Sequence, residues 1–218
     1  MKFCRQLVSQ IFFITLLFGC NAEYEVNVDR SKSYTINFDG TTTYGTLDTP
    51  WTPVGANWEI KLELLWDSSA GANIYPLATN SAVTSIYIDA LGRPLIKYEN
   101  SYISTTSTLR DNELTTIRFS ISATQVKSYF NETLEKTEAT GNTLSVPWTV
   151  IGAHASYSGK FKGQIRKITL TDLDDPSNSR VINLVITTEN KATLSQDSFR
   201  EHTGIDFTLP ASDKFTEL

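Results

Sequence analysis

Cysteine is the scarcest useful residue in the sequence. The 218 residues include two cysteines, Cys4 and Cys20, and both lie within the first 20 positions. Residues 21–218 therefore cannot form an internal disulfide, a thiolate metal site or a cysteine nucleophile. The stability of this part must come from a packed core, and its length suffices for one such core.

Histidine and the motifs of common hydrolases are scarce as well. The two histidines, His154 and His202, lie far apart in the chain, and neither belongs to an HExxH pattern. The sequence also lacks a GxSxG pattern, which marks the nucleophile of α/β-hydrolases. We expect His154, within GAHASYSG, to be a polar loop residue.

Clusters of basic residues are missing too. Two of the 19 basic residues, Lys2 and Arg5, precede residue 20, so 17 basic residues stand against 24 acidic ones in the rest of the chain, a net charge of −7. Binding to nucleic acid requires lysine and arginine to displace counterions. We therefore expect no nucleic-acid partner.

The N-terminus has the layout of a secretory signal. Two basic residues precede an apolar run at residues 7–18, which is too short to span a bilayer stably. Leu17, Gly19 and Cys20 resemble the lipobox of bacterial lipoproteins, in which the cysteine is acylated and becomes the new N-terminus. The resemblance implies a signal peptide at residues 1–19. The alternative is a plain signal peptide with a chance cysteine near its cleavage site.

The residues after Cys20 bear on location. In Gram-negative lipoproteins a residue other than Asp after the cysteine implies sorting to the outer membrane, and Asn21 stands there. The lipobox resemblance thus implies a bacterial outer-membrane protein, anchored by lipid on the periplasmic or extracellular face. Residues 20–32 are expected to be the lipidated N-terminus and a polar spacer.

Short alternating runs predict an all-β fold. They are separated by turn signals, and no amphipathic helix is expected. The runs are YTINF, WEIKLEL, SIYID, PLIKY, TIRFSI, QVKSYF, VPWTVIGA, GQIRKITL and RVINLVI. Such evenly spaced strands indicate a sandwich of two antiparallel sheets. The inward positions expected in YTINF, WEIKLEL and TIRFSI are Tyr34, Ile36, Phe38, Trp58, Ile60, Leu62, Leu64, Ile117, Phe119 and Ile121.

The order of these pieces resembles the laminin-G-like, or concanavalin A-like, jelly rolls of bacterial and phage surface proteins. The resemblance covers about residues 33–175 and is carried by INFDGTTTYGTL, WEIKLELLW, SIYIDALGRPLIKY, TSTLRDNELTTIRFSISATQVKSYFNETLEKTEAT and VIGAHASYSGKFKGQIRKITLTDL. It implies a two-sheet antiparallel jelly roll of the lectin and glucanase type. We expect the domain at residues 33–190 and a C-terminal extension, 191–218, partly packed on the sandwich.

The strand WEIKLEL raises the question of catalysis. Laminarinase-type glycoside hydrolases on this fold carry Glu-x-Asp-x-Glu on one strand, and Glu59 and Glu63 fall in that register. Lys61 stands where those enzymes have Asp. A retaining pair needs one neutral carboxyl group, and a lysine two residues from each glutamate favours both ionised forms. We therefore expect no catalytic residues here, and a charged ladder on a solvent-facing sheet surface instead.

Two further candidate sites follow from residue type. Laminin-G-like domains often hold Ca²⁺ at a loop rim, and this resemblance suggests Asp39, Asp172, Asp174 and Asp175 as its ligands, although three aspartates before a proline are also ordinary turn chemistry. Aromatic residues near loops could stack on sugar rings, or could equally plug the open ends of the sandwich. The candidate ligand-binding aromatics are Trp51, Trp66, Tyr75, Tyr102, Trp148 and Tyr157, whereas Trp58 is expected in the core.

Together these features favour a non-catalytic surface lipoprotein whose jelly roll binds a glycan or a partner protein, in adhesion or polysaccharide capture. The first alternative is a polysaccharide hydrolase or lyase on the same fold. The second is a structural subunit of a surface assembly.

The lipobox yields a direct prediction. In Cys20→Ser the acylated atom is lost, so the protein should leave the membrane fraction or remain unprocessed. Detergent phase partitioning and mass spectrometry of the N-terminal peptide measure this outcome. Unchanged partitioning of the variant would contradict lipidation at Cys20.

Overall fold

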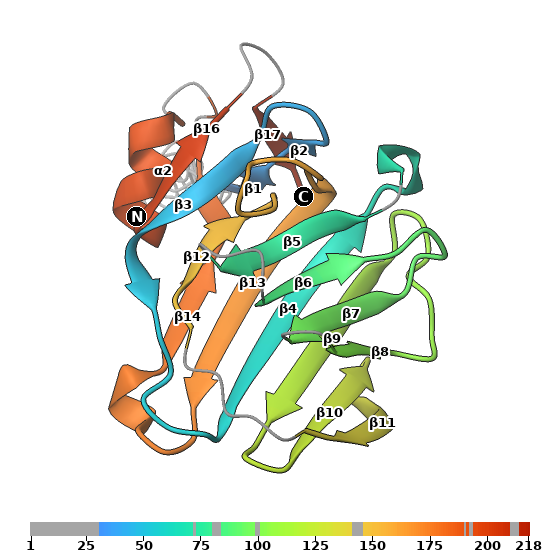
Figure 1. Cartoon of the computed structure of the whole chain (residues 1–218). Coiled ribbons are helices and arrows are strands. Elements are labelled where there is room, and N and C mark those ends of the chain that lie inside the picture. Colours follow the sequence, from blue (N-terminus) through green and yellow to red (C-terminus); the bar gives the residue numbers. More distant parts are fainter. Residues whose placement is uncertain are drawn as a thin grey trace, which may run out of the picture. The chain divides into compact units, whose positions relative to one another are not determined.

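Figure 1 shows the computed structural model of the chain. It describes residues 31–71, 73–79, 84–98, 101–140, 146–189, 191, 194–209 and 214–218. Ser31–Leu218 form one compact unit. Cys20, the signal segment and most of the spacer lie outside the described residues, so their roles remain predictions. Within the described part, no helix is long and apolar enough to cross a membrane.

The unit is an all-β jelly-roll sandwich, as the sequence predicts. What we call the first sheet has the order β11-β10-β9-β4-β13-β14, with β2 paired to one end of β13. Figure 1 shows its long central strands, β4 and β13, running side by side. The bounds are β2 Phe38–Asp39, β4 Trp58–Trp66, β9 Leu114–Ile121, β10 Gln125–Phe130, β11 Thr133–Ala139, β13 Lys162–Asp172 and β14 Arg180–Asn183.

The second sheet packs against the first and has the order β16-β3-β12-β5-β6-β7-β8. A small third sheet has the order β15-β1-β17. All strand pairs in the three sheets are antiparallel. The bounds are β1 Lys32–Ile36, β3 Tyr44–Trp51, β5 Ile74–Thr79, β6 Thr84–Ile88, β7 Pro94–Tyr98, β8 Ser101–Ser104, β12 Trp148–Ile151, β15 Val185–Thr188, β16 Ile205–Thr208 and β17 Phe215–Glu217.

Strand β4 confirms the predicted alternation. Its residues are buried and half-buried in strict turn from Trp58 to Trp66. The inward side chains meet the inward side of β9, where Ile60 lies opposite Phe119 in the ladder, and both side chains are fully buried. Burying each such side chain contributes roughly 1.5–3 kcal/mol. The hydrophobic core between the two sheets is therefore centred on this strand.

Three tryptophans fill the middle of this core. The ring of Trp58 packs edge-to-face on Trp51 and on Trp148, with centroids 6.2 and 6.0 Å apart. The indole N–H of Trp51 donates to the backbone carbonyl of Asn178 at 2.8 Å, so its polar atom is satisfied. Edge-to-face packing adds about 0.5–1.5 kcal/mol per pair beyond burial. Trp58 lies in the core as predicted.

The run YTINF departs from the expected single strand. Residues up to Ile36 belong to β1 in the third sheet, whereas Phe38 belongs to β2 in the first sheet. The break falls at Asn37, whose backbone N–H donates to the carbonyl of Lys214 at 3.0 Å. The chain changes sheets here because its backbone hydrogen bonds go to partners near the C-terminus.

The C-terminal residues contain a helix that the sequence pattern did not predict. α2 spans Gln196–Thr203, begins with a capping box between Ser195 and Ser198, and ends at Gly204 in the left-handed region. Its one buried residue is Phe199. A helix with a single buried residue has no apolar periodicity, so only its cap residues could have indicated it.

The described residues of the segment 191–218 take part in the sheets and in the core to a greater extent than the partly packed extension that was expected. β16 pairs with β3 at the edge of the second sheet, and β17 pairs with β1. Phe199, Ile205 and Phe207 are part of the main hydrophobic core. The described part of this segment thus completes the sandwich, because it covers core that the preceding residues leave open.

Two substitutions test the assigned strand faces. Ile60→Asp or Phe119→Asp places a carboxylate in the core without a partner and should lower the free energy of unfolding by about 3–5 kcal/mol. Thr169→Asp is the matched control, since Thr169 faces outward on β13 opposite Lys61, and it should change stability by less than about 1 kcal/mol. Chemical denaturation measures the three values. An unchanged unfolding midpoint in either core variant would show that the faces are wrong.

Candidate functional site

The outer face of the first sheet carries the charged residues of WEIKLEL. Glu59 accepts a hydrogen bond from the Arg118 guanidinium at 3.0 Å. The Lys61 ammonium lies 2.6 Å from a carboxylate oxygen of Glu132, and Glu63 lies 3.9 Å from the Lys167 ammonium. Lys61 thus pairs with Glu132, and not with the two glutamates on its own strand as the sequence suggested. Each carboxylate faces a cation on a neighbouring strand or turn.

The aspartates proposed for calcium lie at opposite ends of β13. Asp39 pairs with Lys162 at the start of β13, whereas Asp172 is its last residue. An eleven-residue strand places them about 33 Å apart. The four aspartates therefore do not form one ligand set. Among the residues that the structure describes, no group of three or more candidate metal ligands is found.

The carboxylates of Asp39 and Asp172 already accept hydrogen bonds from backbone N–H groups. The Asp39 carboxylate accepts the N–H groups of Thr41, Thr42 and Thr43 at 2.7–2.9 Å. Burial by itself raises the pKa of Asp39, but these hydrogen bonds outweigh it and lower the pKa to about 2. Asp39 is therefore the anion around which this turn is built.

Asp172 has the same role at the other end. Its buried carboxylate accepts the N–H groups of Val54, Asp174 and Asp175 and the side-chain amide of Asn178, at 2.7–3.1 Å. Burial again opposes the ionised form, and the hydrogen bonds lower the pKa below its ordinary value. Asp172 thereby joins the loop before β4 to the loop after β13.

The three tryptophans proposed for ligand stacking are wrong candidates. Trp51 and Trp148 are buried in the core, and Trp66 is 9% exposed. Trp66 packs against the turn at Gly92, where a Cβ would lie 2.9 Å from its ring. Each of these tryptophans lies at a strand end. Whether its side chain points into the core or toward solvent therefore depended on how the strands pair, and not on its distance from a loop.

The three tyrosines proposed with them do come together. Tyr75, Tyr102 and Tyr157 lie on the outer face of the second sheet with Tyr44, Tyr87 and His154, and we call these six residues the tyrosine row. Tyr102 and Tyr157 are 52% and 46% exposed, and the other four are half-buried.

Ring contacts make the row continuous over much of its length. Tyr75 lies between His154 and Tyr87, with centroids 4.7 and 5.4 Å apart, and Tyr87 contacts Tyr102 at 6.1 Å. Tyr157 packs on Tyr44 at 4.6 Å. The loop between β12 and β13 joins these two groups. The rings thus form a band across the strands.

That loop holds its aromatic residue in an unusual conformation. Tyr157 has a φ of 57°, in the left-handed region that bulky residues rarely adopt. Its backbone N–H donates to the carbonyl of His154 at 2.7 Å, and the His154 N–H donates to the carbonyl of Ser158 at 2.9 Å. The tight turn keeps both rings on the sheet surface, and such outliers cluster at functional sites.

The alternation of β6 explains why a tyrosine faces outward there. Ile86 and Ile88 point into the core, so Tyr87 between them must point out. Small side chains beside the row, Ala78, Val150 and Ala153, pack with Tyr44 on the same face. Nearness to a loop did not indicate Tyr44 and Tyr87, which belong to β3 and β6, and His154 was expected to be only a polar loop residue. Aromatic residues at outward positions of alternating strands would have been the useful signal.

The row is neutral, with cations beside it. Burial, with smaller effects from Tyr102 and Tyr75, raises the pKa of Tyr87 to about 12. Burial and the nearby Lys97 lower the pKa of His154, so its imidazole is neutral at pH 7. The Lys97 ammonium lies 6.0 Å from the ring of Tyr102. The band therefore offers apolar ring faces together with uncharged hydroxyl groups that can donate and accept hydrogen bonds.

Comparison with known proteins yields structural neighbours only. No protein-family model matches the sequence, and no curated protein matches it. A candidate carbohydrate-binding protein from Bacteroides ovatus is 14% identical with a TM-score of 0.50, over 84% of this chain and 53% of its own. A heptameric pentraxin from Limulus polyphemus is 13% identical with a TM-score of 0.49, over 73% of this chain and 96% of its own.

Domains LG4–5 of the mouse laminin α1 chain are 16% identical with a TM-score of 0.49, over 72% of this chain and 45% of theirs. The chain thus spans about half the length of the Bacteroides and laminin chains. At these identities the likeness concerns the fold alone. The described part of the chain has the jelly-roll fold that the laminin-G-like resemblance implies, and it shares this fold with the Bacteroides protein.

Proposed function

We propose that this domain is a non-catalytic module that binds a glycan chain along the tyrosine row. The observation that carries the proposal is the band of six aromatic side chains across one outer face of the sandwich. Sugar rings present C–H faces to aromatic rings and hydroxyl groups to polar atoms, and the row supplies partners for both. Exposed aromatic residues gathered on one face of a soluble domain are typical of binding surfaces.

The direction of the row supports an extended ligand. Its residues come from β3, β5, β6 and β8 and from the loop after β12, so the band crosses the strands of the second sheet. Five strand spacings separate β3 from β8, which gives a length of about 24 Å. A band of this length suits several consecutive sugar units better than one. The name of the Bacteroides neighbour agrees with this function, although it shares only the fold.

The proposal includes a location at the outer membrane, on its periplasmic or extracellular face. A lipid on Cys20 would tether the domain to the outer membrane, and residues 20–32 would act as the spacer. Ser31–Leu218 would then present the tyrosine row to polysaccharide, which suits adhesion or capture. The same surface could receive a partner protein, and the binding experiment below separates the two.

A glycan array with the purified protein tests the row. We expect binding to at least one oligosaccharide, and Tyr87→Ala and Tyr102→Ala should each weaken its Kd about tenfold, because each removes one stacking ring. Tyr129→Ala is the matched control: Tyr129 lies on the first sheet, stacked with Arg118, and its loss should leave the Kd unchanged. Absence of glycan binding, or equal weakening in all three variants, would contradict the proposal.

An assay for released reducing sugar tests the prediction that the glutamates of β4 are not catalytic. The protein should release no reducing sugar from β-glucans, agars or other polysaccharides, since Glu59 and Glu63 each face a cation and not one another. Glu59→Gln and Glu63→Gln should change the free energy of unfolding by about 1 kcal/mol or less. Hydrolysis by the wild type that either variant abolishes would establish the hydrolase alternative.

A further inference from the structure

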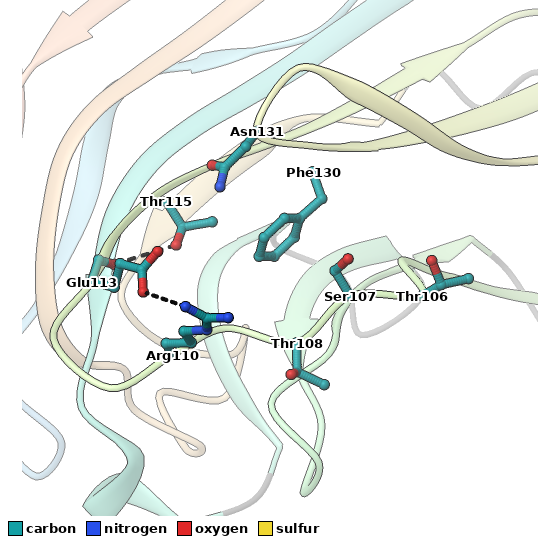
Figure 2. Close-up of a pocket in the computed structure, with 8 residues that line it drawn as sticks. All are labelled: Thr106, Ser107, Thr108, Arg110, Glu113, Thr115, Phe130 and Asn131. Atoms are coloured by element: carbon teal, nitrogen blue, oxygen red, sulfur yellow. Dashed lines mark hydrogen bonds and ion pairs between the residues drawn. The ribbon is translucent and has the colours of Figure 1, made fainter.

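A polar hollow of about 380 Å³ has no lining residue in common with the tyrosine row, and we call it the edge pocket. Figure 2 shows its lining, in which the Phe130 side chain projects toward the centre of the group. One wall comes from the loop between β8 and β9, and the other from the end of β10 and its turn. The lining residues are Thr106, Ser107, Thr108, Arg110, Glu113, Thr115, Phe130 and Asn131.

Hydrogen bonds from β11 fix the first wall. The Glu135 carboxylate accepts the backbone N–H groups of Thr106 and Ser107, at 2.8 and 3.1 Å, and also the Ser107 hydroxyl. Burial raises the pKa of Glu135, but these bonds outweigh it and lower the pKa. The buried Thr105 hydroxyl donates to the carbonyl of Ser107 at 2.8 Å. The loop is therefore held before any ligand arrives.

The second wall is fixed in the same way. The Asn131 side-chain oxygen accepts the Thr116 N–H at 3.0 Å, and the Asn131 N–H donates to the Thr116 carbonyl at 2.8 Å. These bonds orient the side-chain amide so that its nitrogen faces the hollow in Figure 2. A preformed pocket loses less entropy on binding than one that must be ordered by its ligand.

The lining of the edge pocket combines one cation, one anion, neutral polar groups and one aromatic ring. The Arg110 guanidinium lies 3.6 Å from the Glu113 carboxylate, and the side chains are 81% and 51% exposed, so both keep unused hydrogen-bonding capacity toward solvent. Threonine hydroxyls and the Asn131 amide add neutral donors and acceptors, and Phe130 supplies one apolar surface. One cation beside one anion gives no preference for a charged ligand.

We propose that the edge pocket binds a single neutral sugar ring through vicinal hydroxyl groups. Such a diol both donates and accepts hydrogen bonds, so one oxygen can accept from Arg110 while its neighbour donates to Glu113. The ring's C–H groups would meet Phe130. The volume lies in the range of small-ligand pockets, about 300–1,000 Å³. This site shares no residue with the tyrosine row and does not depend on glycan binding there.

NMR titration of the ¹⁵N-labelled protein tests the pocket. The probes are methyl α- and β-glycosides of glucose, galactose, mannose and N-acetylglucosamine, and cyclohexanol is the control that has a ring but no diol. At least one glycoside should shift the backbone amides of Thr106, Ser107, Thr108 and Asn131 with a millimolar Kd, and cyclohexanol should not.

Variants assign the binding to this pocket. Arg110→Ala and Glu113→Gln should each weaken the glycoside Kd about tenfold. Arg200→Ala is the matched control, because it removes another exposed ion pair, with Asp48 at 3.2 Å. Tyr87→Ala should also leave this Kd unchanged, which separates the pocket from the tyrosine row. The proposal is overturned if no glycoside moves these amides, if cyclohexanol moves them equally, or if Arg110→Ala and Glu113→Gln bind like the wild type.

Discussion

The two-residue alternation of β4 is the constraint on which the rest of the structure depends. The strand lies inside the first sheet between β9 and β13, so its backbone hydrogen bonds are satisfied on both sides. One of its faces must then fill the space between the sheets, and Trp58 does so with Trp51 and Trp148 packed on it. Because a shift by one residue would exchange the faces, this packing fixes the register of the sheet.

Because the inward side chains of the two sheets fill the core, the outward side chains of each sheet are free to differ in charge and aromatic content. On the first sheet the outward residues of β4 and its neighbours form ion pairs, as between Glu59 and Arg118. On the second sheet the outward residues are largely aromatic and uncharged, as at Tyr75 and Tyr87. The first pattern favours solvation, and the second leaves ring faces available to a ligand. The functional difference between the faces thus follows from side chains that the core does not use.

Hydrogen-bonded carboxylates, one buried and two half-buried, hold the loops of a domain that has no cysteine for a disulfide. Asp39, Asp172 and Glu135 each accept several backbone N–H groups. Asp39 closes its own turn, whereas Asp172 and Glu135 join segments that are far apart in the sequence. Hydrogen bonds to an ionised acceptor are among the stronger ones in proteins. The loops at both ends of β13 and the wall of the edge pocket are fixed in this way, which is why acidic turn residues here need not indicate a metal.

The sequence by itself determined the all-β class, the inward faces of β4 and β9 and the hairpin of β6 and β7, because alternation is a property of neighbouring residues. It also placed three members of the tyrosine row among its candidates, Tyr75, Tyr102 and Tyr157. Only the tertiary structure decided that Trp51 and Trp148 are core, that Asp39 lies far from Asp172, and that α2 completes the sandwich. These features depend on which strands pair across long stretches of chain, and no local pattern encodes that pairing.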